Sequence, residues 1–194
     1  MRASPKNRRA VAALVAAIAF AVAGCATPPR TTANVTFPST DEPFSVDGRL
    51  SARQGTKAAT VHFRWTHQPP RDDLAVATPL GQSLAELHGD SARGVVEVRT
   101  AEGTREEAAD WSTLTERTLG FRLPIGGLTE WIRAAPQRDQ PYSIETDAQG
   151  RVSLLRQGSW EIVYDYADAS SRRPTRYRIS YPELEIRMVI DEWK

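Results

Sequence analysis

Most of the chain after residue 43 alternates between hydrophobic and polar positions, and this period of two predicts β-strands that are buried on one face. At 44–53, for example, Phe44, Val46, Leu50 and Ala52 share one parity, and mostly polar residues take the other. Nine further segments alternate in the same way or adjoin clear turn signals. We expect these strands at 59–65, 74–78, 83–88, 94–100, 142–146, 151–157, 160–166, 176–181 and 184–190.

The period changes between the fifth and sixth predicted strands, where two helices are expected. The first covers 111–119, with Asp110 as its N-cap and Gly120 as its C-terminal stop. The second contains Trp131 and must end before Pro136, because the residue before a proline disfavours the helical conformation.

Short connections and alternating strands predict one antiparallel sheet with a hydrophobic face and a solvated face. Ten strands are many for an open flat sheet, so we expect the sheet to curl. The two helices are the natural cover for its concave face. The pattern leaves open whether the space between sheet and helices is solid or hollow.

The sequence ATPLGQ at 77–82 lies between two predicted strands and predicts a tight turn. Thr78 at position i, Pro79 at i+1 and Gly81 at i+3 suit a type I turn, and a left-handed Gly81 would complete a three-residue hairpin with a bulge. Leu80 then occupies the exposed tip, where Asn, Asp, Ser or Gly is usual. Turn chemistry gives no reason for a leucine there.

The N-terminal segment is first basic and then uniformly hydrophobic. Fourteen apolar residues run over 10–23, fewer than the roughly 20 that a membrane-spanning helix needs, and they fit the core of a secretory signal peptide. The sequence VAGC then places small residues directly before Cys25. This resembles a bacterial lipobox, which implies cleavage after residue 24 and lipid attachment to Cys25. The alternative is an inert cysteine in an ordinary signal peptide.

Residues 26–43 hold four prolines and five threonines, which predicts a disordered tether ahead of a domain at 44–194. As a flexible coil it would span roughly 20–25 Å. Processing would leave 21 basic and 24 acidic residues, a net charge of −3. The sequence has no basic stripe interleaved with aromatic residues, so we expect no nucleic-acid partner.

Side chains that could catalyse a reaction or bind a metal are sparse. His62, His67 and His88 fall on polar positions or near strand ends, and we interpret all three as solvated. The segment 81–85 resembles a nucleophile elbow only loosely, because its final glycine is missing. No metal spacing and no nucleotide motif is present, so we expect no enzyme, no metal and no cofactor.

Five tryptophans in one small domain are many, and they fall on or beside the predicted strands and helices. They indicate either a packed aromatic core or an apolar ligand cavity with tryptophan in its walls. Composition alone favours the packed core.

Six segments, taken in their order and spacing, resemble the LolB family of outer-membrane lipoprotein receptors. They cover nearly the whole mature domain and follow the lipobox and the proline-rich tether. They read GRLSAR, VHFRWTHQ, LAVATPLGQSLAEL, LPIGGLTEWIRAAP, QGSWEIVYDY and MVIDEW.

The resemblance implies a mainly β fold, an incomplete, half-open antiparallel β-barrel of about 10–11 strands with a short helical lid over a hydrophobic cavity. It implies a protein that accepts lipoproteins from the soluble periplasmic carrier LolA, binds their acyl chains and incorporates them into the lipid of the outer membrane. It also implies anchoring through Cys25 at the periplasmic face of that membrane. Ala26, rather than aspartate, follows Cys25 and permits this location under the sorting rule of enteric bacteria.

By position, the family's exposed functional leucine corresponds to Leu80 in the loop Pro79–Gly81, which we expect to contact the membrane. The expected cavity lining consists of Phe63, Trp65, Leu74, Val76, Trp111, Leu114, Leu123, Trp131, Ile132, Trp160, Ile162 and Tyr164. The alternative function is a structural outer-membrane lipoprotein with a solid core and protein partners only.

Overall fold

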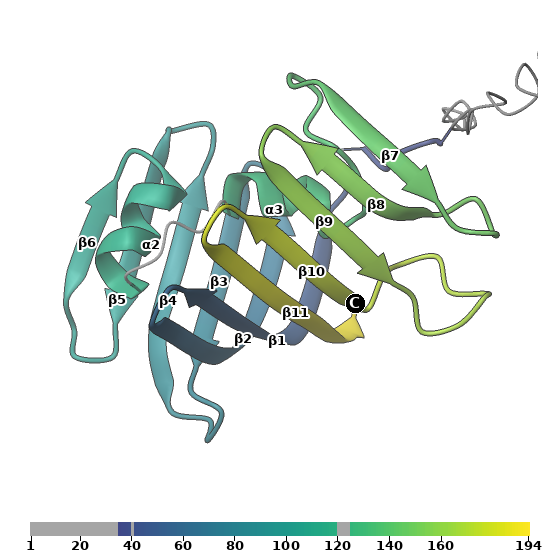
Figure 1. Cartoon of the computed structure of the whole chain (residues 1–194). Helices are drawn as coiled ribbons and strands as arrows, with labels where there is room; N and C mark the ends of the chain where they lie inside the picture. The colour runs from purple at the N-terminus through teal and green to yellow at the C-terminus, as the bar shows by residue number, and fades with distance from the viewer. Residues whose placement is uncertain (1–34, 40, 120–124) are drawn as a thin grey trace, which may run out of the picture. The chain divides into compact units, whose positions relative to one another are not determined.

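A computed structural model describes residues 35–39, 41–119 and 125–194. Its main element is one antiparallel sheet of eleven strands in the order β6-β5-β4-β3-β2-β1-β11-β10-β9-β8-β7 (Figure 1). The strands are β1 (Phe44–Gln54), β2 (Lys57–Gln68), β3 (Arg71–Ala77), β4 (Ser83–Asp90), β5 (Val95–Thr100), β6 (Arg105–Ala108), β7 (Tyr142–Thr146), β8 (Val152–Gln157), β9 (Trp160–Asp165), β10 (Arg176–Tyr181) and β11 (Leu184–Trp193).

The sheet is open, because its edge strands β6 and β7 do not pair with each other. The predicted fold class is confirmed: the protein is mainly β, with one antiparallel sheet that does not close into a barrel and with small helices. All ten strands expected from alternation are present. The eleventh, β6, has the sequence REEA and three exposed residues, so no alternation marked it. Its charges suit an edge strand, which must not pair with another chain.

The two helices described are α2 (Trp111–Leu119) and α3 (Ile125–Trp131). The predicted N-cap of α2 is confirmed, since Asp110 Oδ1 accepts a 2.8 Å hydrogen bond from the backbone N–H of Thr113. The predicted stop at Gly120 lies outside the described residues. Helix α3 ends at Trp131, ahead of Pro136 as expected. Figure 1 shows α2 beside β5 and β6.

The inner face of the sheet carries two hydrophobic clusters. The larger packs α3 against strands on both sides of β1, and the smaller packs α2 against β3, β4 and β5. Leu74 and Trp111 are half-buried and contact both clusters. They therefore mark a seam between two packed regions.

Strand register assigns the loops to two opposite ends of the sheet. Phe44 pairs with His67, whereas Gln54 pairs with Lys57; we call these the Phe44 end and the Gln54 end. The β3–β4 turn lies at the Gln54 end. The Phe44 end holds the β7–β8 turn, the β9–β10 loop, the C-terminus and the incoming segment, of which residues 35–39 and 41–43 are described. This placement determines which surfaces can act together.

Candidate functional site

The β3–β4 hairpin presents Leu80 to solvent on a hydrogen-bonded turn. The backbone N–H of Gly81 donates to the carbonyl of Thr78 at 2.9 Å, and that of Thr78 donates to the carbonyl of Gln82 at 2.8 Å. Gly81 has a φ of 84°, the left-handed conformation that a type I turn with a bulge requires. The turn predicted from the sequence is thus confirmed in its geometry.

Leu80 is 90% exposed, far more than any other large hydrophobic residue described. Because the turn is closed by backbone hydrogen bonds, the leucine contributes nothing to its formation. The Thr78 hydroxyl also accepts from the N–H of Gln82 at 3.1 Å. Leu80 is therefore an apolar group on a well-ordered support, free to contact something outside the chain.

The residues predicted to line a cavity lie together in the interior, with Leu123 as the one that falls outside the described residues. Eight of them are at most 8% exposed, and Leu74, Trp111 and Trp160 are half-buried. They contact one another within the two clusters. The structure shows packed side chains at these positions, so their role in binding stays a prediction.

A cavity of about 590 Å³ opens beside the seam, between the N-terminus of α2, helix α3 and the ends of β2 to β5. Trp111 forms part of its wall, and the ring of Trp111 lies over Gly89, where a Cβ would overlap it. Ten of the other lining residues have polar side chains. Its acidic residues are Asp41, Asp72, Asp90, Asp110 and Glu130.

His67, also in this wall, is buried rather than solvated, so the interpretation from sequence was wrong for this histidine. Only 6% of it is exposed. Its Nδ1 lies 2.9 Å from Asp72 Oδ1, and its ring stacks on Phe44 with centroids 5.0 Å apart. The same carboxylate oxygen accepts from the Trp65 indole at 2.8 Å. The burial results from partners on the neighbouring strands β1 and β3. The sequence of β2 alone does not reveal them.

Glu130, which also lines this cavity, has a carboxyl whose pKa differs from its ordinary value. Burial raises the pKa of its carboxyl, and the charge of Arg133 opposes that rise. Its Oε2 accepts no hydrogen bond from the described part of the chain. A partly buried carboxylate thus faces the polar mouth beside the seam.

A second cavity, of about 670 Å³, lies at the Phe44 end beneath the incoming segment. The described residues of this segment, 35–39 and 41–43, are docked on the domain: Val35 and Phe37 pack against the larger cluster. Arg133 Nη1 donates to the carbonyls of Ser39 at 2.5 Å and Glu42 at 3.1 Å. No pattern in the sequence indicated this docking. The domain boundary at residue 44 stays a prediction.

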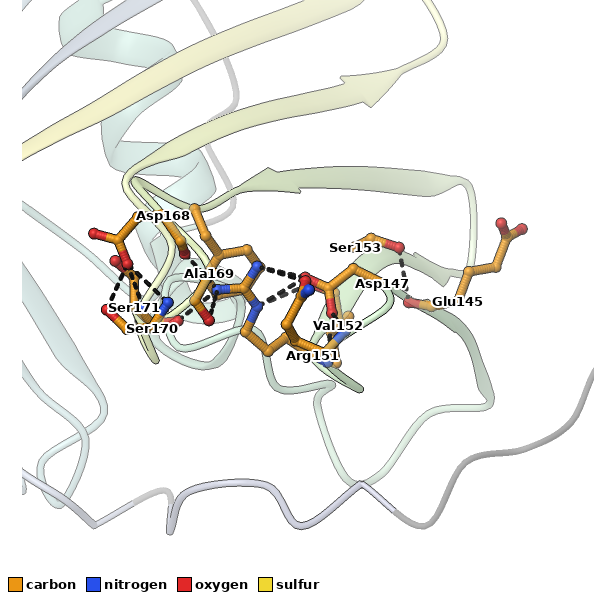
Figure 2. A network of polar contacts seen from close by, with 11 residues as sticks. Glu145, Asp147, Arg151, Val152, Ser153, Asp168, Ala169, Ser170 and Ser171 are labelled. Atoms are coloured by element: carbon orange, nitrogen blue, oxygen red, sulfur yellow. Dashed lines mark hydrogen bonds and ion pairs between the residues drawn. The ribbon is translucent and has the colours of Figure 1, made fainter.

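One wall of this second cavity is held by Arg151 (Figure 2). Its guanidinium donates to Asp147 Oδ2 at 2.7 Å and to the carbonyls of Asp168 at 2.8 Å and Ser171 at 2.7 Å. The same group lies 4.0 Å from the centroid of the Tyr166 ring. Arg151 thereby joins the β7–β8 turn to the β9–β10 loop and orders that loop.

No group of residues that could hold a metal ion, and no helix long and apolar enough to cross a membrane, occurs among the described residues. Cys25 lies outside them, so its lipidation stays a prediction.

The open antiparallel sheet with small helices also occurs in solved structures of other proteins. The fold is similar to that of a LolA superfamily protein from Nitrosomonas europaea, with a TM-score of 0.51 at 9% identity over 81% of this chain and 88% of the other.

The particular family follows from the sequence comparison. Residues 42–193 match the family described as outer membrane lipoprotein LolB. The chain is 33% identical to the outer-membrane lipoprotein LolB of Azoarcus sp., over 96% of both chains. It is also 33% identical to that of Chromobacterium violaceum, over 93% of this chain and 97% of the other. The chain belongs to the LolB family, which is one of transport lipoproteins rather than enzymes.

Proposed function

We propose that this protein accepts lipoproteins from a LolA-type periplasmic carrier, holds their acyl chains at the inner face of its sheet and inserts them into the outer membrane. Family membership supports the general role in lipoprotein localisation. The observation that carries the inserting step is Leu80, which is 90% exposed on a closed turn.

Acyl chains would enter at the seam between the two clusters. Leu74 and Trp111 are only half-buried there, and the 590 Å³ cavity opens beside Trp111. Entry requires side chains at the seam to move apart, because the inner face is packed. The polar cavity wall would then face the polar part of the cargo.

Transfer needs no nucleotide if each site covers the acyl chains more completely than the one before. Each buried methylene contributes about 0.8 kcal/mol, so small differences in coverage set the direction. The bilayer gives the most complete burial. Leu80 would lower the barrier of this last step by entering the headgroup region first.

The test separates acceptance from insertion. Mature lipidated protein is mixed with carrier that holds a labelled lipoprotein, and transfer is followed before and after vesicles are added. Wild type should empty the carrier and load the vesicles. Leu80→Glu should empty the carrier but retain the cargo, whereas the control Leu80→Phe should insert it.

Cargo that stays on the carrier with wild-type protein would refute acceptance. Wild-type insertion rates with Leu80→Glu would refute the role of the leucine. The alternative, a structural lipoprotein with a solid core, predicts in addition that an apolar fluorescent probe does not bind the interior.

A further inference from the structure

The 670 Å³ cavity at the Phe44 end has a basic wall that the transfer function leaves unused. Four of its lining residues are arginines and only one, Glu42, is acidic. The arginines are Arg133, Arg151, Arg172 and Arg173. A site with this balance favours an anion.

Two of these guanidiniums are committed to the fold. Arg151 is neutralised by Asp147 and orders the β9–β10 loop. Arg133 donates to backbone carbonyls of the incoming segment. These contacts build the wall and leave the recognition of an external anion to the two neighbouring arginines of the loop.

Arg172 and Arg173 are both exposed at the rim. Arg172 has no hydrogen-bond or ion-pair partner among the described residues. Arg173 meets Glu42 at 3.7 Å with both side chains nearly half exposed, a weak pair. Planar guanidiniums that are exposed and lack a strong partner bind phosphate well, because their N–H groups can donate to two phosphate oxygens at once.

Apart from Thr36, the rest of the lining is apolar or aromatic. Val35, Phe37, Phe44, Tyr166 and Trp193 contribute to it, and the guanidinium of Arg173 lies 4.8 Å from the Trp193 ring centroid. A cationic rim over an aromatic wall suits an amphiphile with an anionic head. An acidic protein surface would use the rim but not the wall.

The position of the cavity along the chain indicates where such an amphiphile would come from. Val35 is in its lining and stands ten residues after Cys25. A chain spans at most about 3.3–3.6 Å per residue, so the cavity lies within roughly 35 Å of Cys25. The bilayer that holds the anchor is thus the nearest source of ligand.

We propose that the cavity lined by Val35, Phe44, Arg172 and Arg173 binds the phosphate headgroup of an anionic phospholipid, and so holds the Phe44 end against the membrane between transfer events. The proposal rests on the proposed function only through the anchor at Cys25. It is independent of acyl-chain transfer and of Leu80.

The test uses mature lipidated protein in nanodiscs of phosphatidylcholine alone or mixed with phosphatidylglycerol. Hydrogen exchange is measured for the β9–β10 loop. We expect exchange there to slow several-fold in the anionic discs, because a bound headgroup orders the loop. Arg172→Gln with Arg173→Gln should abolish the difference. The matched control, Arg53→Gln with Lys57→Gln, removes the same charge at the Gln54 end and should keep it.

Equal exchange in both disc types, or protection that survives the double substitution at 172 and 173, would overturn the proposal. Inorganic phosphate added to the phosphatidylcholine discs should not reproduce the protection; if it does, the site takes free phosphate instead. If the double variant keeps the lipid effect but no longer accepts cargo from the carrier, the rim serves protein docking, and the proposal fails. Protein that does not enter the nanodiscs at all would refute the lipid anchor at Cys25. This outcome is visible before any exchange is measured.

Discussion

The indole Nε1 of Trp131 donates a 3.0 Å hydrogen bond to Oε1 of Gln157, which ties helix α3 to strand β8. The same oxygen accepts from the backbone N–H of Gln137 at 3.0 Å. The Gln157 amide donates to the carbonyls of Gln137 at 2.7 Å and Gln140 at 3.2 Å. Gln157 is 1% exposed, so one buried amide fixes both the helix and the chain that leaves it.

Replacing Gln157 with alanine should therefore destabilise the domain by about 2–3 kcal/mol, because a buried indole and backbone groups lose their partners. For a domain of this size the melting temperature should fall by roughly 4–10 °C. Gln68→Ala, at an exposed position of β2, is the control and should change little. Equal melting temperatures for wild type and Gln157→Ala would show that water replaces the clamp.

Leu80→Glu should leave the free energy of unfolding within about 0.5 kcal/mol of wild type, since the side chain is exposed and the turn is closed by the backbone. Leu128→Glu makes the same replacement at a position that is 4% exposed in α3. It should prevent stable folding, because a carboxylate would be buried without a partner. Urea unfolding of both variants gives the comparison, and a large loss with Leu80→Glu would mean that this leucine packs in solution.

Gly89→Ala should displace helix α2, because the added Cβ would overlap the ring of Trp111. We expect a loss of about 1–3 kcal/mol, as for other overpacked positions. In Trp111→Ala protein the same substitution should cost much less, since the overlapping ring is gone. A double-mutant cycle by chemical unfolding measures this coupling, and strictly additive losses would contradict the close packing of the two residues.

Glu130→Gln should stabilise the protein above neutral pH more than at about pH 4. Burial raises the pKa of this carboxyl in the folded state above its ordinary 4.5. At pH values between 4.5 and the raised pKa of the folded state, the folded state binds more protons than the unfolded state. Wild-type stability therefore falls as pH rises through the pKa of the folded state. The glutamine variant lacks this loss. Melting curves across pH give the difference, and a constant offset at all pH values would contradict the shift.

Local chemistry explains which features were predictable from the sequence. The Asp110 cap, the Leu80 turn and the ten alternating strands each depend on residues close together in the chain. The edge strand β6 could not be predicted, because it is held by backbone pairing to β5 and its side chains carry no hydrophobic pattern.

The parts of the site that were not predicted depend on contacts between distant segments. The burial of His67 results from Phe44 and Asp72 on neighbouring strands. The docking of the incoming segment involves hydrogen bonds from Arg133 to Ser39 and Glu42, more than ninety residues away. How far the interior is filled depends on how all these side chains pack together, which alternation does not record.

The docked segment also has a consequence for the orientation of the domain. The ten residue steps from Cys25 to Val35 span at most about 35 Å, and β1, with its eleven residues, is about 33 Å long at 3.3 Å per residue. A tether about as long as a strand of the sheet would not by itself determine which end of the domain faces the bilayer. If the headgroup site and Leu80 act as proposed, the two ends of the sheet, with guanidinium groups at one and a leucine at the other, would select between two orientations of the domain at the membrane.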